Sequence, residues 1–463
     1  MRKGKKLGFL LASIFTILLL VGLALFMTAI FEGDKPHIRL EPLPQYISSP
    51  KTFKLEIGDK GRGLKSLLVT IEQGGRERKI LEKRFPFKGL LNMDGLREHR
   101  IEFTVDPELL NLGQGRADLK VVVRDYSRRN GGDGNLAVLE HKLVVDTIPP
   151  AIRPLSRLNY INVGGTGLLV YVASSDTVKS GVYAGELFFP GFKAGPKYPE
   201  DNHVCYFTIP LNLKRGYQLF LWAGDRAGNS SKVGFYYKIR RKRFRTERIN
   251  ITDAFLSRVL PYFSDYLQGI NGSDIEKFLW INRNLRKRNT QTFRELGQKS
   301  SAQQLWEGRW LRLKNSATMA HFGDRRLYYY KGRKVDEQVH LGVDLASLAH
   351  SKVPAANTGK VIFSGPLGIY GITVVLDHGQ GLSSVYSHLS EALVQIGQMV
   401  KKGEIIGITG QTGLAGGDHL HFGVMVHGIF VNPVEWWDLH WIKDNVTRKL
   451  KLLSSGVTSE RLR

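Results

Sequence analysis

The polar and apolar positions of the chain fall into three patterns: one long apolar run, many short alternating segments and one stretch with helical spacing. Leu7 to Phe31 carries no charged residue over 25 positions, enough to cross about 30 Å of hydrocarbon as a helix. Four basic residues lie among the six positions before it, and such residues favour the cytoplasmic side of a membrane. We therefore predict a basic cytoplasmic stub and a transmembrane anchor over residues 1–36.

A cleaved signal peptide is the alternative for this segment. Its apolar core is usually only about 7–15 residues long and ends at a small-residue cleavage site, which the sequence does not provide. We favour an uncleaved single-pass anchor in the inner (cytoplasmic) membrane. Everything after residue 36 then lies outside the cytoplasm, on the periplasmic side.

From residue 37 to 245, apolar and polar positions alternate in short runs separated by turn residues, as in β-strands. Two segments, 119–127 and 217–229, each combine an apolar strand with an aspartate turn, about one small β-domain apart. The junction Val144 to Pro150 ends in two prolines, which cannot donate hydrogen bonds to a sheet ladder. We predict β-sandwich modules over 37–147 and 148–245.

Both modules resemble the tandem immunoglobulin-like modules of bacterial surface proteins, in which a D-x-x-PP junction and an A-x-D-x-A-G-N strand end are common. The resemblance rests on Asp146 to Pro150 and on Ala223 to Asn229. It implies either a surface that binds an envelope protein or the cell wall, or a spacer that holds the next domain off the membrane. We favour the spacer.

Residues 246–313 change to helical spacing, and we predict a helical linker there. Thr252 or Asp253 can cap a helix that runs up to Pro261, and Ser273 can start another. The linker is either a plain connector or an inhibitory lid over a catalytic cleft.

The composition narrows the fold class and the partners. A chain of 463 residues exceeds one hydrophobic core, and its single cysteine, Cys205, excludes an intrachain disulfide and a site built from several thiolates. We expect a mainly β multidomain protein.

The formal net charge is +25, with the densest basic run at 238–245. Outside the membrane the abundant polyanions are lipid head groups, lipopolysaccharide and peptidoglycan carboxylates, so we expect envelope material as the partner and no nucleic acid.

Seven of the 13 histidines lie between positions 340 and 427, a density typical of a metal or proton-transfer site. In a strand, His419 and His421 project to the same face, and His340 and Asp344 are likewise in phase. Two histidine nitrogens and one aspartate oxygen satisfy Zn²⁺ and leave a fourth position open, which is the arrangement of a catalytic site. The spacing therefore favours a catalytic zinc centre.

The remaining histidines of this segment fall into two groups. His388 is a third candidate for the centre, the alternative being a strand histidine bonded to a neighbouring carbonyl. For His350, His378 and His427 we expect that second, structural role.

Residues from about Asn315 to Trp437 resemble the LytM/lysostaphin-type M23 metallopeptidase domain. The matching motifs are a lead-in HFGDR, an HxGxD run, a YSHL strand and a closing HLHF, at positions 321–325, 340–344, 386–389 and 419–422. We place the domain at 314–440 and a basic tail at 441–463. The aromatic and basic run 328–333 precedes the first motif histidine and could form a wall of the substrate cleft or an exposed hairpin.

The resemblance implies that His340, Asp344 and His421 bind zinc. It also implies that His388 and His419 flank the metal-bound water, His419 as the general base and His388 orienting water or stabilising the tetrahedral intermediate. Relatives that have lost catalysis usually lack one or more of these residues, and all five are present in this chain.

We therefore expect a membrane-anchored zinc endopeptidase that hydrolyses the peptide cross-links of peptidoglycan. The substrate rests on the resemblance alone, and two alternatives stay open. The chain could be an envelope regulator that activates another wall hydrolase while its own metal site is covered. It could also be a peptidase that acts on an exported protein.

Overall fold

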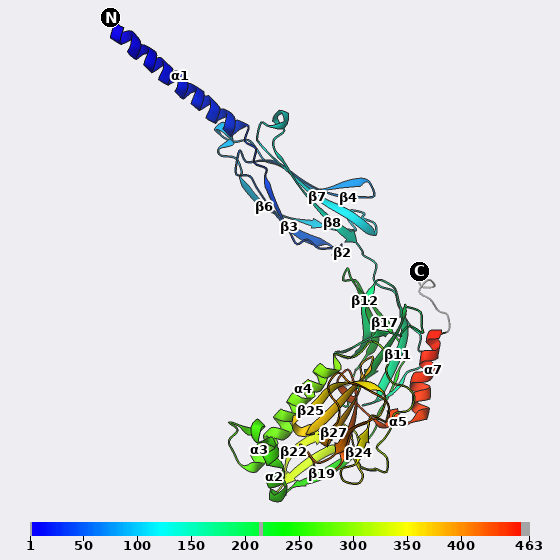
Figure 1. The fold of residues 1–463 in the computed structure, drawn as a ribbon. Helices are drawn as coiled ribbons and strands as arrows, with labels where there is room; N and C mark the ends of the chain where they lie inside the picture. Colours follow the sequence, from blue (N-terminus) through cyan, green and yellow to red (C-terminus); the bar gives the residue numbers. More distant parts are fainter. Residues whose placement is uncertain (1, 213–215, 455–463) are drawn as a thin grey trace. The chain divides into compact units, whose positions relative to one another are not determined.

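The computed structural model describes residues 2–212 and 216–454, with side chains from Leu7 onward. The chain divides into two compact units (Figure 1): the first comprises Met1–Pro149 with Arg226–Asn229, and the second comprises Pro150–Asp225 with Ser230–Arg463. Strands predominate in both units, which confirms the predicted mainly β fold.

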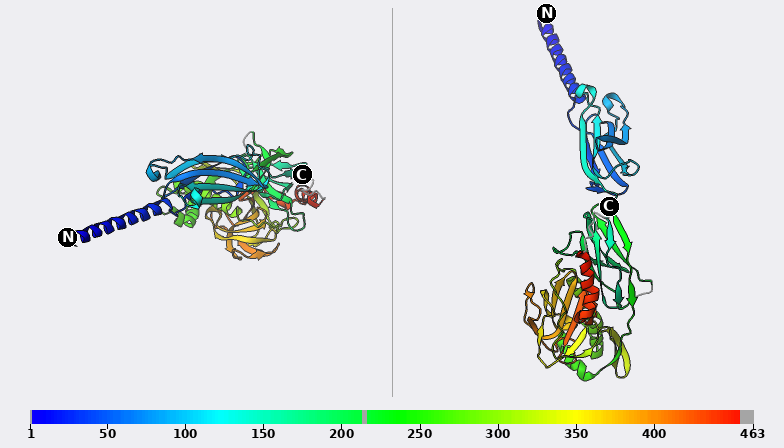
Figure 2. Two further views of the ribbon diagram at one scale, coloured as in Figure 1. Left: turned by 90° about the horizontal axis from the view of Figure 1, so that it is seen from above. Right: turned by 90° about the vertical axis from the view of Figure 1, so that its right-hand side faces the viewer.

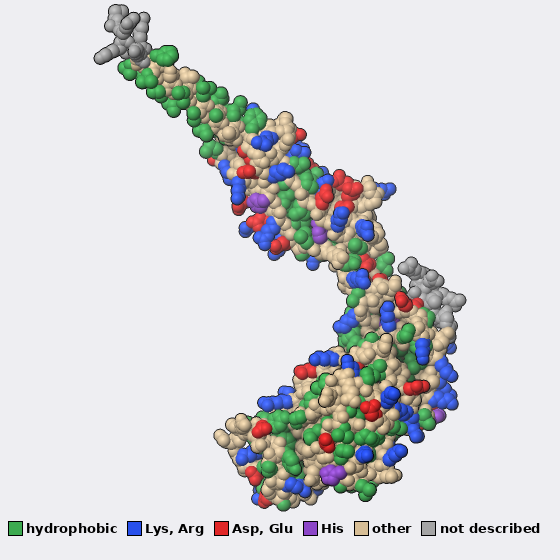
Figure 3. Space-filling view, viewed as in Figure 1, with side chains coloured by type: hydrophobic (Ala, Val, Ile, Leu, Met, Phe, Trp, Pro, Cys, Tyr) green, Lys and Arg blue, Asp and Glu red, His purple; other side chains and the backbone are tan. Residues whose placement is uncertain are grey.

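The first unit begins with one long helix, α1 (Arg2–Ile30). Its apolar side chains are exposed, and Figure 3 shows them as a hydrophobic surface along the helix. Leu7–Ile30, with 24 residues, is long and apolar enough to cross a membrane. Because no other described element covers this surface, lipid is a better solvent for it than water. The predicted apolar helix is confirmed.

Two sheets packed face to face follow α1 in the first unit. Their strand orders are β1-β3-β6 and β2-β8-β7-β4-β5. Along β7, every second residue from Ala117 to Asp125 is buried, which is the period expected of a strand with one face on a core. The bounds are β1 (His37–Glu41), β2 (Tyr46–Ile47), β3 (Lys51–Gly58), β4 (Leu64–Gln73), β5 (Arg76–Arg84), β6 (Glu98–Val105), β7 (Gly115–Asp125) and β8 (Leu136–Val145). The side chains between the sheets form a hydrophobic core of their own.

The second unit opens with a second pair of sheets, in the orders β14-β15-β11-β9 and β13-β12-β16-β17, beside a short parallel pair β10-β18. All residues of β11 are buried, as expected of a strand covered on both faces. The bounds are β9 (Ile152–Pro154), β10 (Tyr160–Asn162), β11 (Thr166–Ala173), β12 (Thr177–Ala184), β13 (Leu187–Pro190), β14 (Phe192–Lys193), β15 (Asn202–Thr208), β16 (Leu219–Asp225), β17 (Ser230–Gly234) and β18 (Lys238–Arg240).

The segment that follows is a strand and then a set of short helices. Thr252 caps the first helix by accepting a hydrogen bond from the Phe255 amide, and Ser273 caps another through a capping box with Glu276, so both predicted helix starts are confirmed. The strand had not been predicted, and it pairs in parallel with β21. The bounds are β19 (Thr246–Ile251), α2 (Asp253–Val259), α3 (Asp274–Trp280) and α4 (Arg286–Gly297), with 3₁₀ and π turns at Leu260–Leu267 and Ile281–Leu285.

A large antiparallel sheet forms the rest of the second unit, with the main order β20-β23-β30-β27-β26-β25-β28. The hairpin β21-β22 pairs with β19 beside it. The strand bounds are β20 (Ala317–Ala320), β21 (Arg325–Tyr330), β22 (Arg333–Val339), β23 (Val343–Ala346), β24 (Lys352–Pro354), β25 (Gly359–Pro366), β26 (Ile372–Gly379), β27 (Leu382–Ala392), β28 (Met399–Val400), β29 (Ile405–Thr409), β30 (Leu420–Val426) and β31 (Ile429–Val431). The chain closes with α5 (Val434–Trp437), α6 (Leu439–Ile442), a π turn (Lys443–Thr447) and α7 (Arg448–Lys451).

The C-terminal helices join the module of residues 150–240 to the large sheet. Figures 1 and 2 show α7 beside the strands of that module. The buried Lys449 side chain donates hydrogen bonds to Asn159 Oδ1 at 2.8 Å and to the Leu168 carbonyl at 2.9 Å. Apolar side chains of the module, the helices and the large sheet belong to one continuous core. Part of the predicted basic tail is therefore packed, whereas its residues 455–463 lie outside the described residues.

Glu435 is the second buried charge at this junction. Its carboxylate accepts hydrogen bonds from Asn162 Nδ2 at 2.9 Å and from the Thr166 amide at 2.8 Å. Burial raises the pKa of Glu435 from 4.5 to about 7, and the two hydrogen bonds only partly offset this effect. The fold therefore favours the protonated carboxyl group.

We predict that this carboxyl group makes the second unit less stable as pH rises. Its contribution is fully present below the unfolded pKa of 4.5 and is lost as pH rises through about 7. The difference between the two pKa values corresponds to roughly 3 kcal/mol of unfolding free energy. Glu435→Gln should remove this dependence, so urea unfolding should show the variant gaining stability relative to wild type between about pH 5 and about pH 8. Exposed Glu391→Gln is the control, and parallel profiles for Glu435→Gln and wild type would contradict the prediction.

Candidate metal centre and active site

Three adjacent strands of the large sheet place the candidate residues on one face. Asp344 on β23 is the direct cross-strand partner of His421 on β30, and His421 is in turn opposite Ser387 on β27. Directly opposed residues of an antiparallel pair have neighbouring side chains. His388 follows Ser387, and His340 lies in the turn that leads into β23, so sheet pairing gathers four of the five candidates.

Three donor atoms converge at this point. His340 Nε2 lies 2.9 Å from Asp344 Oδ1 and 3.0 Å from His421 Nδ1. His421 Nδ1 lies 2.8 Å from Asp344 Oδ1. All three residues are buried, with 4–7% of their surface exposed. These three residues form a group that could hold a metal ion.

Hydrogen bonds fix which nitrogen each histidine presents. The Nδ1 atoms of His340, His388 and His419 lie 2.8–3.0 Å from the backbone carbonyls of residues 321, 412 and 417, respectively. A carbonyl oxygen only accepts, so each Nδ1 carries the proton and each Nε2 keeps a free lone pair. Carbonyl partners of this kind orient histidine ligands in metal sites.

The donor set fits zinc. His340 Nε2, His421 Nδ1 and the Asp344 carboxylate oxygen converge on one place, and one cation there can bind all three. Two nitrogens and one carboxylate oxygen suit Zn²⁺, and three protein ligands leave a fourth position for water or substrate. The Nε2 of His421, on the far side of its ring, is buried without a hydrogen-bond partner, which is consistent with Nδ1 being the atom that binds.

The pKa shifts favour the ligand-ready forms of these groups. Burial alone would raise the pKa of Asp344, but His340 and His421 hold it well below its usual range. Burial lowers the pKa of His421 to about 4, and burial together with His419 and His421 lowers the pKa of His388 well below its ordinary value. Metal ligands must be deprotonated, so an ionised Asp344 and a neutral His421 match the requirement.

His388 occupies a strained position in β27. The strand is irregular there, because Ser387 pairs with His421 while Leu389 pairs with Thr409 on a different strand. The φ angle of His388 is +60°, in the left-handed region that residues other than glycine rarely adopt. Such backbone conformations cost on the order of 1 kcal/mol or more and gather at functional sites. The bulge turns the His388 ring toward His419, with ring centroids 4.9 Å apart.

His419 lies next to the three converging atoms. Its Nε2 is 3.6 Å from Asp344 Oδ1, and its side chain is more exposed than those of the other four, at 15%. A free lone pair beside the metal position and partial access to solvent are what a general base requires. The structure thus brings together all five residues that the sequence singled out.

The other three histidines of the segment lie elsewhere. His378 is hydrogen-bonded on both ring nitrogens, to the Thr358 carbonyl and Ser384 Oγ, and His427 stacks on Phe192. The His350 amide donates to Asp418 Oδ2 at 3.2 Å, which ties the loop 347–351 to the residue before His419.

Arg326 is a neighbour of the centre that the sequence did not indicate. Its guanidinium donates to Asp344 Oδ2 at 2.8 Å, while Oδ1 faces the histidines. Its Nε also lies 3.5 Å from a carboxylate oxygen of Glu247. Arg326 therefore holds the aspartate by the oxygen that does not face the metal position. Only the Arg-Arg pair at the end of the lead-in motif could have suggested it, and nothing in the sequence says which of the two arginines turns inward.

The tyrosine-rich run 328–333 forms the hairpin turn of β21 and β22. Tyr328 is buried against Phe278 of α3, and the Tyr330 hydroxyl donates to Asp253 at 2.7 Å. The run is thus a hairpin packed on the helical segment. The guanidinium of Arg258 on α2 reaches the Gly416 carbonyl at 3.2 Å, which brings the same helical segment to the loop before His419.

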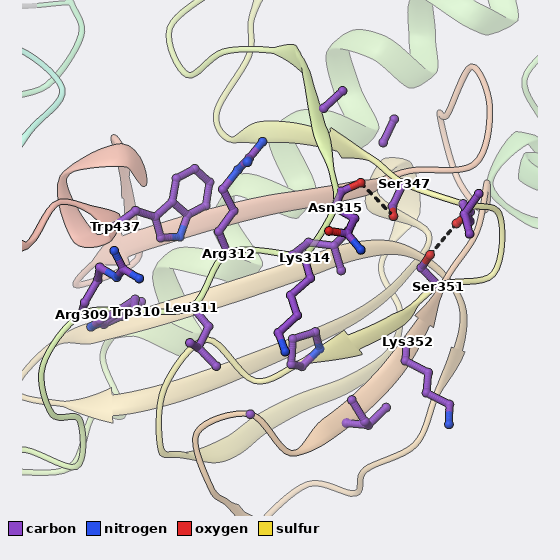
Figure 4. A pocket seen from close by; sticks show the side chains of 17 residues that line it. Arg309, Trp310, Leu311, Arg312, Lys314, Asn315, Ser347, Ser351, Lys352 and Trp437 are labelled. Carbon is purple, nitrogen blue, oxygen red and sulfur yellow. Dashed lines mark hydrogen bonds between the residues drawn. The ribbon is translucent and has the colours of Figure 1, made fainter.

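The loop 347–351 borders a basic groove with a volume of about 1190 Å³ (Figure 4). Four cationic side chains line it, and its lining contains no aspartate or glutamate. They are Arg309, Arg312, Lys314 and Lys352. Trp437 forms part of the wall, with the Arg312 guanidinium 5.8 Å from its ring centroid. The groove suits a ligand that carries negative charge.

Comparisons with known proteins place this region in a family. Residues 338–433 match peptidase family M23. The DD-carboxypeptidase/endopeptidase Mpg of Neisseria meningitidis is 39% identical over 97 residues, which are 21% of this chain and 22% of that protein. The peptidoglycan DD-endopeptidase ShyA of Vibrio cholerae is 34% identical over 116 residues, 25% of this chain and 26% of that protein. The murein hydrolase activator EnvC of Escherichia coli is 35% identical over 95 residues, 20% of this chain and 23% of that protein.

The aligned segments span about a quarter or less of each of these relatives. Residues 338–433, which match the family, contain all five site residues. The family description agrees with the three converging donor atoms and with the sequence motifs around them. Residues 338–433 of this chain are therefore a domain of peptidase family M23.

Proposed function

We propose that this protein is a membrane-anchored zinc metalloendopeptidase that hydrolyses peptide cross-links of peptidoglycan. The observation that carries the proposal is the convergence of His340 Nε2, Asp344 Oδ1 and His421 Nδ1 within 3.0 Å of one another, beside the free nitrogen of His419. The substrate class is supported by the name of a relative, the peptidoglycan DD-endopeptidase ShyA.

Zinc bound by these three residues supplies a Lewis acid that makes water nucleophilic near neutral pH and polarises the peptide carbonyl. His419 Nε2 accepts the proton of the attacking water, because its Nδ1 is committed to the Gly417 carbonyl. His388 Nε2 faces the same space, and its free lone pair accepts a hydrogen bond from the attacking water and orients it. Arg326 keeps the Asp344 carboxylate in place during turnover.

A role as activator of another hydrolase is the main alternative, and the likeness to EnvC is the reason to weigh it. The intact donor set favours catalysis, since an activator has no need of three histidines whose tautomers are fixed by backbone carbonyls. A peptidase of an exported protein would use the same residues. The basic groove favours the cell wall over that option, because peptidoglycan stem peptides carry carboxylates along their length.

The anchor proposal rests on α1. A helix with this much exposed apolar surface fits a membrane span, and basic residues at its start favour an N-terminus on the cytoplasmic side. Both units then lie on the periplasmic side of the inner membrane, where peptidoglycan is found.

Variants of a metal ligand and of the general base should differ in how much zinc they bind. We expect His421→Ala to lose both bound zinc and muropeptide release, because two remaining ligands hold zinc poorly. His419→Ala should keep one zinc per chain and lose turnover by about 10²–10⁴-fold. Atomic absorption and chromatography of digested peptidoglycan measure the two quantities. The exposed His440→Ala variant is the control, and a fully active His421→Ala protein would contradict the ligand assignment.

Arg326 should matter for zinc affinity. We expect Arg326→Gln to weaken zinc binding by about 10–100-fold, because the Asp344 carboxylate loses the partner of its second oxygen. The neighbouring Arg325→Gln removes an exposed ion pair to Glu337 and should leave zinc binding unchanged. Competition with a chromophoric chelator measures both affinities. Equal behaviour of the two variants would argue against a positioning role for Arg326.

Charge in the basic groove should affect substrate binding more than turnover. We expect Arg312→Glu together with Lys314→Glu to raise the KM for soluble cross-linked muropeptides by about tenfold or more at low salt, with little change in kcat. For an uncharged peptide substrate, this variant and wild type should have the same KM. Unchanged KM and kcat in this variant would place the groove outside the substrate path.

A further inference from the structure

Three carboxylates meet at the end of the first unit that adjoins the membrane helix. Glu32 lies two residues after α1, Asp59 directly follows β3, and Asp125 is the last residue of β7. One oxygen of each lies within 4.8 Å of the others. Asp59 is 3% exposed and Asp125 is fully buried. We propose that these three side chains bind a calcium ion that fastens the segment after the membrane helix to the β-sandwich.

No ion pair among the described residues neutralises the carboxylates of this site. Among the described residues, no lysine or arginine forms an ion pair with any of the three carboxylates. Arg62 and Arg97 are close enough to influence the site electrostatically, but Arg62 donates to the Leu91 carbonyl and Arg97 to the Lys60 carbonyl. Buried carboxylates need a cation, a proton or several donors. No cationic side chain of the described residues is paired with these carboxylates, so a bound metal cation can take that role.

One oxygen of the site has no partner. Asp59 Oδ2 accepts a hydrogen bond from the Gly63 amide at 2.6 Å, whereas Asp59 Oδ1 is buried without a hydrogen bond to any protein group. Buried carboxylate oxygens in folded proteins are almost always satisfied, and an unsatisfied one costs on the order of 1–3 kcal/mol. A bound cation supplies the missing partner. This observation is independent of the number of acidic residues.

The remaining oxygens are held in place by backbone groups. Asp125 Oδ1 accepts hydrogen bonds from the amides of Ser127 and Asn135 at 2.9 and 2.7 Å. The Asn135 side chain donates to Asp125 Oδ2 and to the carbonyls of Glu32 and Asp34. The segment 32–34 is therefore already tied to the turn after β7. The Glu32 carboxylate does not have to be ordered when an ion binds.

Calcium fits this geometry better than other cations. All donors are oxygens, which disfavours zinc and other ions that prefer nitrogen or sulfur. The three carboxylate oxygens all lie within 4.8 Å of one another, close enough to bind one Ca²⁺ at about 2.4 Å. Magnesium requires a regular octahedron with shorter bonds, which a loop, a strand end and a helix end do not provide.

Without an ion the three groups oppose one another. Burial raises the pKa of Asp59 and of Glu32, and the carboxylate of Asp125 raises both further. The ionised, ion-free site is thus strained, and the strain falls on the joint between the membrane helix and the sandwich. Calcium removes this repulsion, so it stabilises the joint at the periplasmic surface of the proposed topology.

The test uses the full-length protein in detergent, freed of divalent cations and then reloaded with zinc. Isothermal titration calorimetry with CaCl₂ should show one site per chain with a Kd of roughly 10⁻⁴–10⁻³ M, as in extracellular modules. Hydrogen exchange of the peptides that contain Gly63 and Ser127 should slow when calcium is added. Both Glu32→Gln and Asp59→Asn should weaken calcium binding by more than about tenfold.

Glu32→Gln is the decisive variant, because Glu32 lies outside both sheets and its amide analogue keeps the hydrogen bond to the Asp34 backbone. In chelator it should unfold no more readily than wild type, since it removes repulsion. Glu77→Gln, at an exposed position of β5, is the control and should bind calcium as wild type does. Failure of wild type to bind calcium, unchanged binding by Glu32→Gln, or equal binding of magnesium would each overturn the proposal.

Discussion

The register between β23 and β30 is the constraint on which the candidate site depends. It places Asp344 opposite His421, so that a carboxylate oxygen and an imidazole nitrogen from segments 77 residues apart lie 2.8 Å from each other. A slip of one residue would turn either side chain to the opposite face of the sheet. The buried residues that flank these two, such as Val343, Leu345 and Phe422, fix the register through the core. Core packing and the geometry of the candidate metal site are therefore coupled in this sheet.

The surroundings of the site make the same side chains rigid. Backbone carbonyls orient three histidines, Arg326 holds the aspartate, and the bulge at His388 aims its ring. The helical segment supports this arrangement from one side. The Asn289 side chain accepts a hydrogen bond from the Ile369 amide. Phe293 packs on Tyr370, and the Tyr370 ring lies 5.5 Å from the ring of His421. The segment thus acts as a structural support of the domain.

Periodic patterns and local motifs made much of this structure predictable. The apolar run gave α1, strand alternation gave β7, and the residues Thr252 and Ser273 gave helix starts, because each signal lies within a few neighbouring residues. The histidine spacing gave the five site residues for the same reason. Arg326 and the packing of Glu435 and Lys449 on the second module depend on contacts between residues more than a turn or a strand apart, and no local pattern encodes them. The sequence interpretation favoured a spacer role for both β-sandwich modules, and that role stays a prediction. The structure adds that the module of residues 148–245 shares its core with the peptidase domain.

The central claim is that the five residues form a zinc centre that cleaves peptide bonds in the cell wall. The most direct test is mass spectrometry of the products released from purified peptidoglycan by the full-length protein, before chelation, after chelation and after zinc is restored. We expect new free amino and carboxyl ends at peptide cross-links, intact glycan bonds, loss of cleavage with the chelator and recovery with zinc. Cleavage that persists in the chelator, or the absence of cleavage by folded, zinc-loaded protein, would contradict the claim.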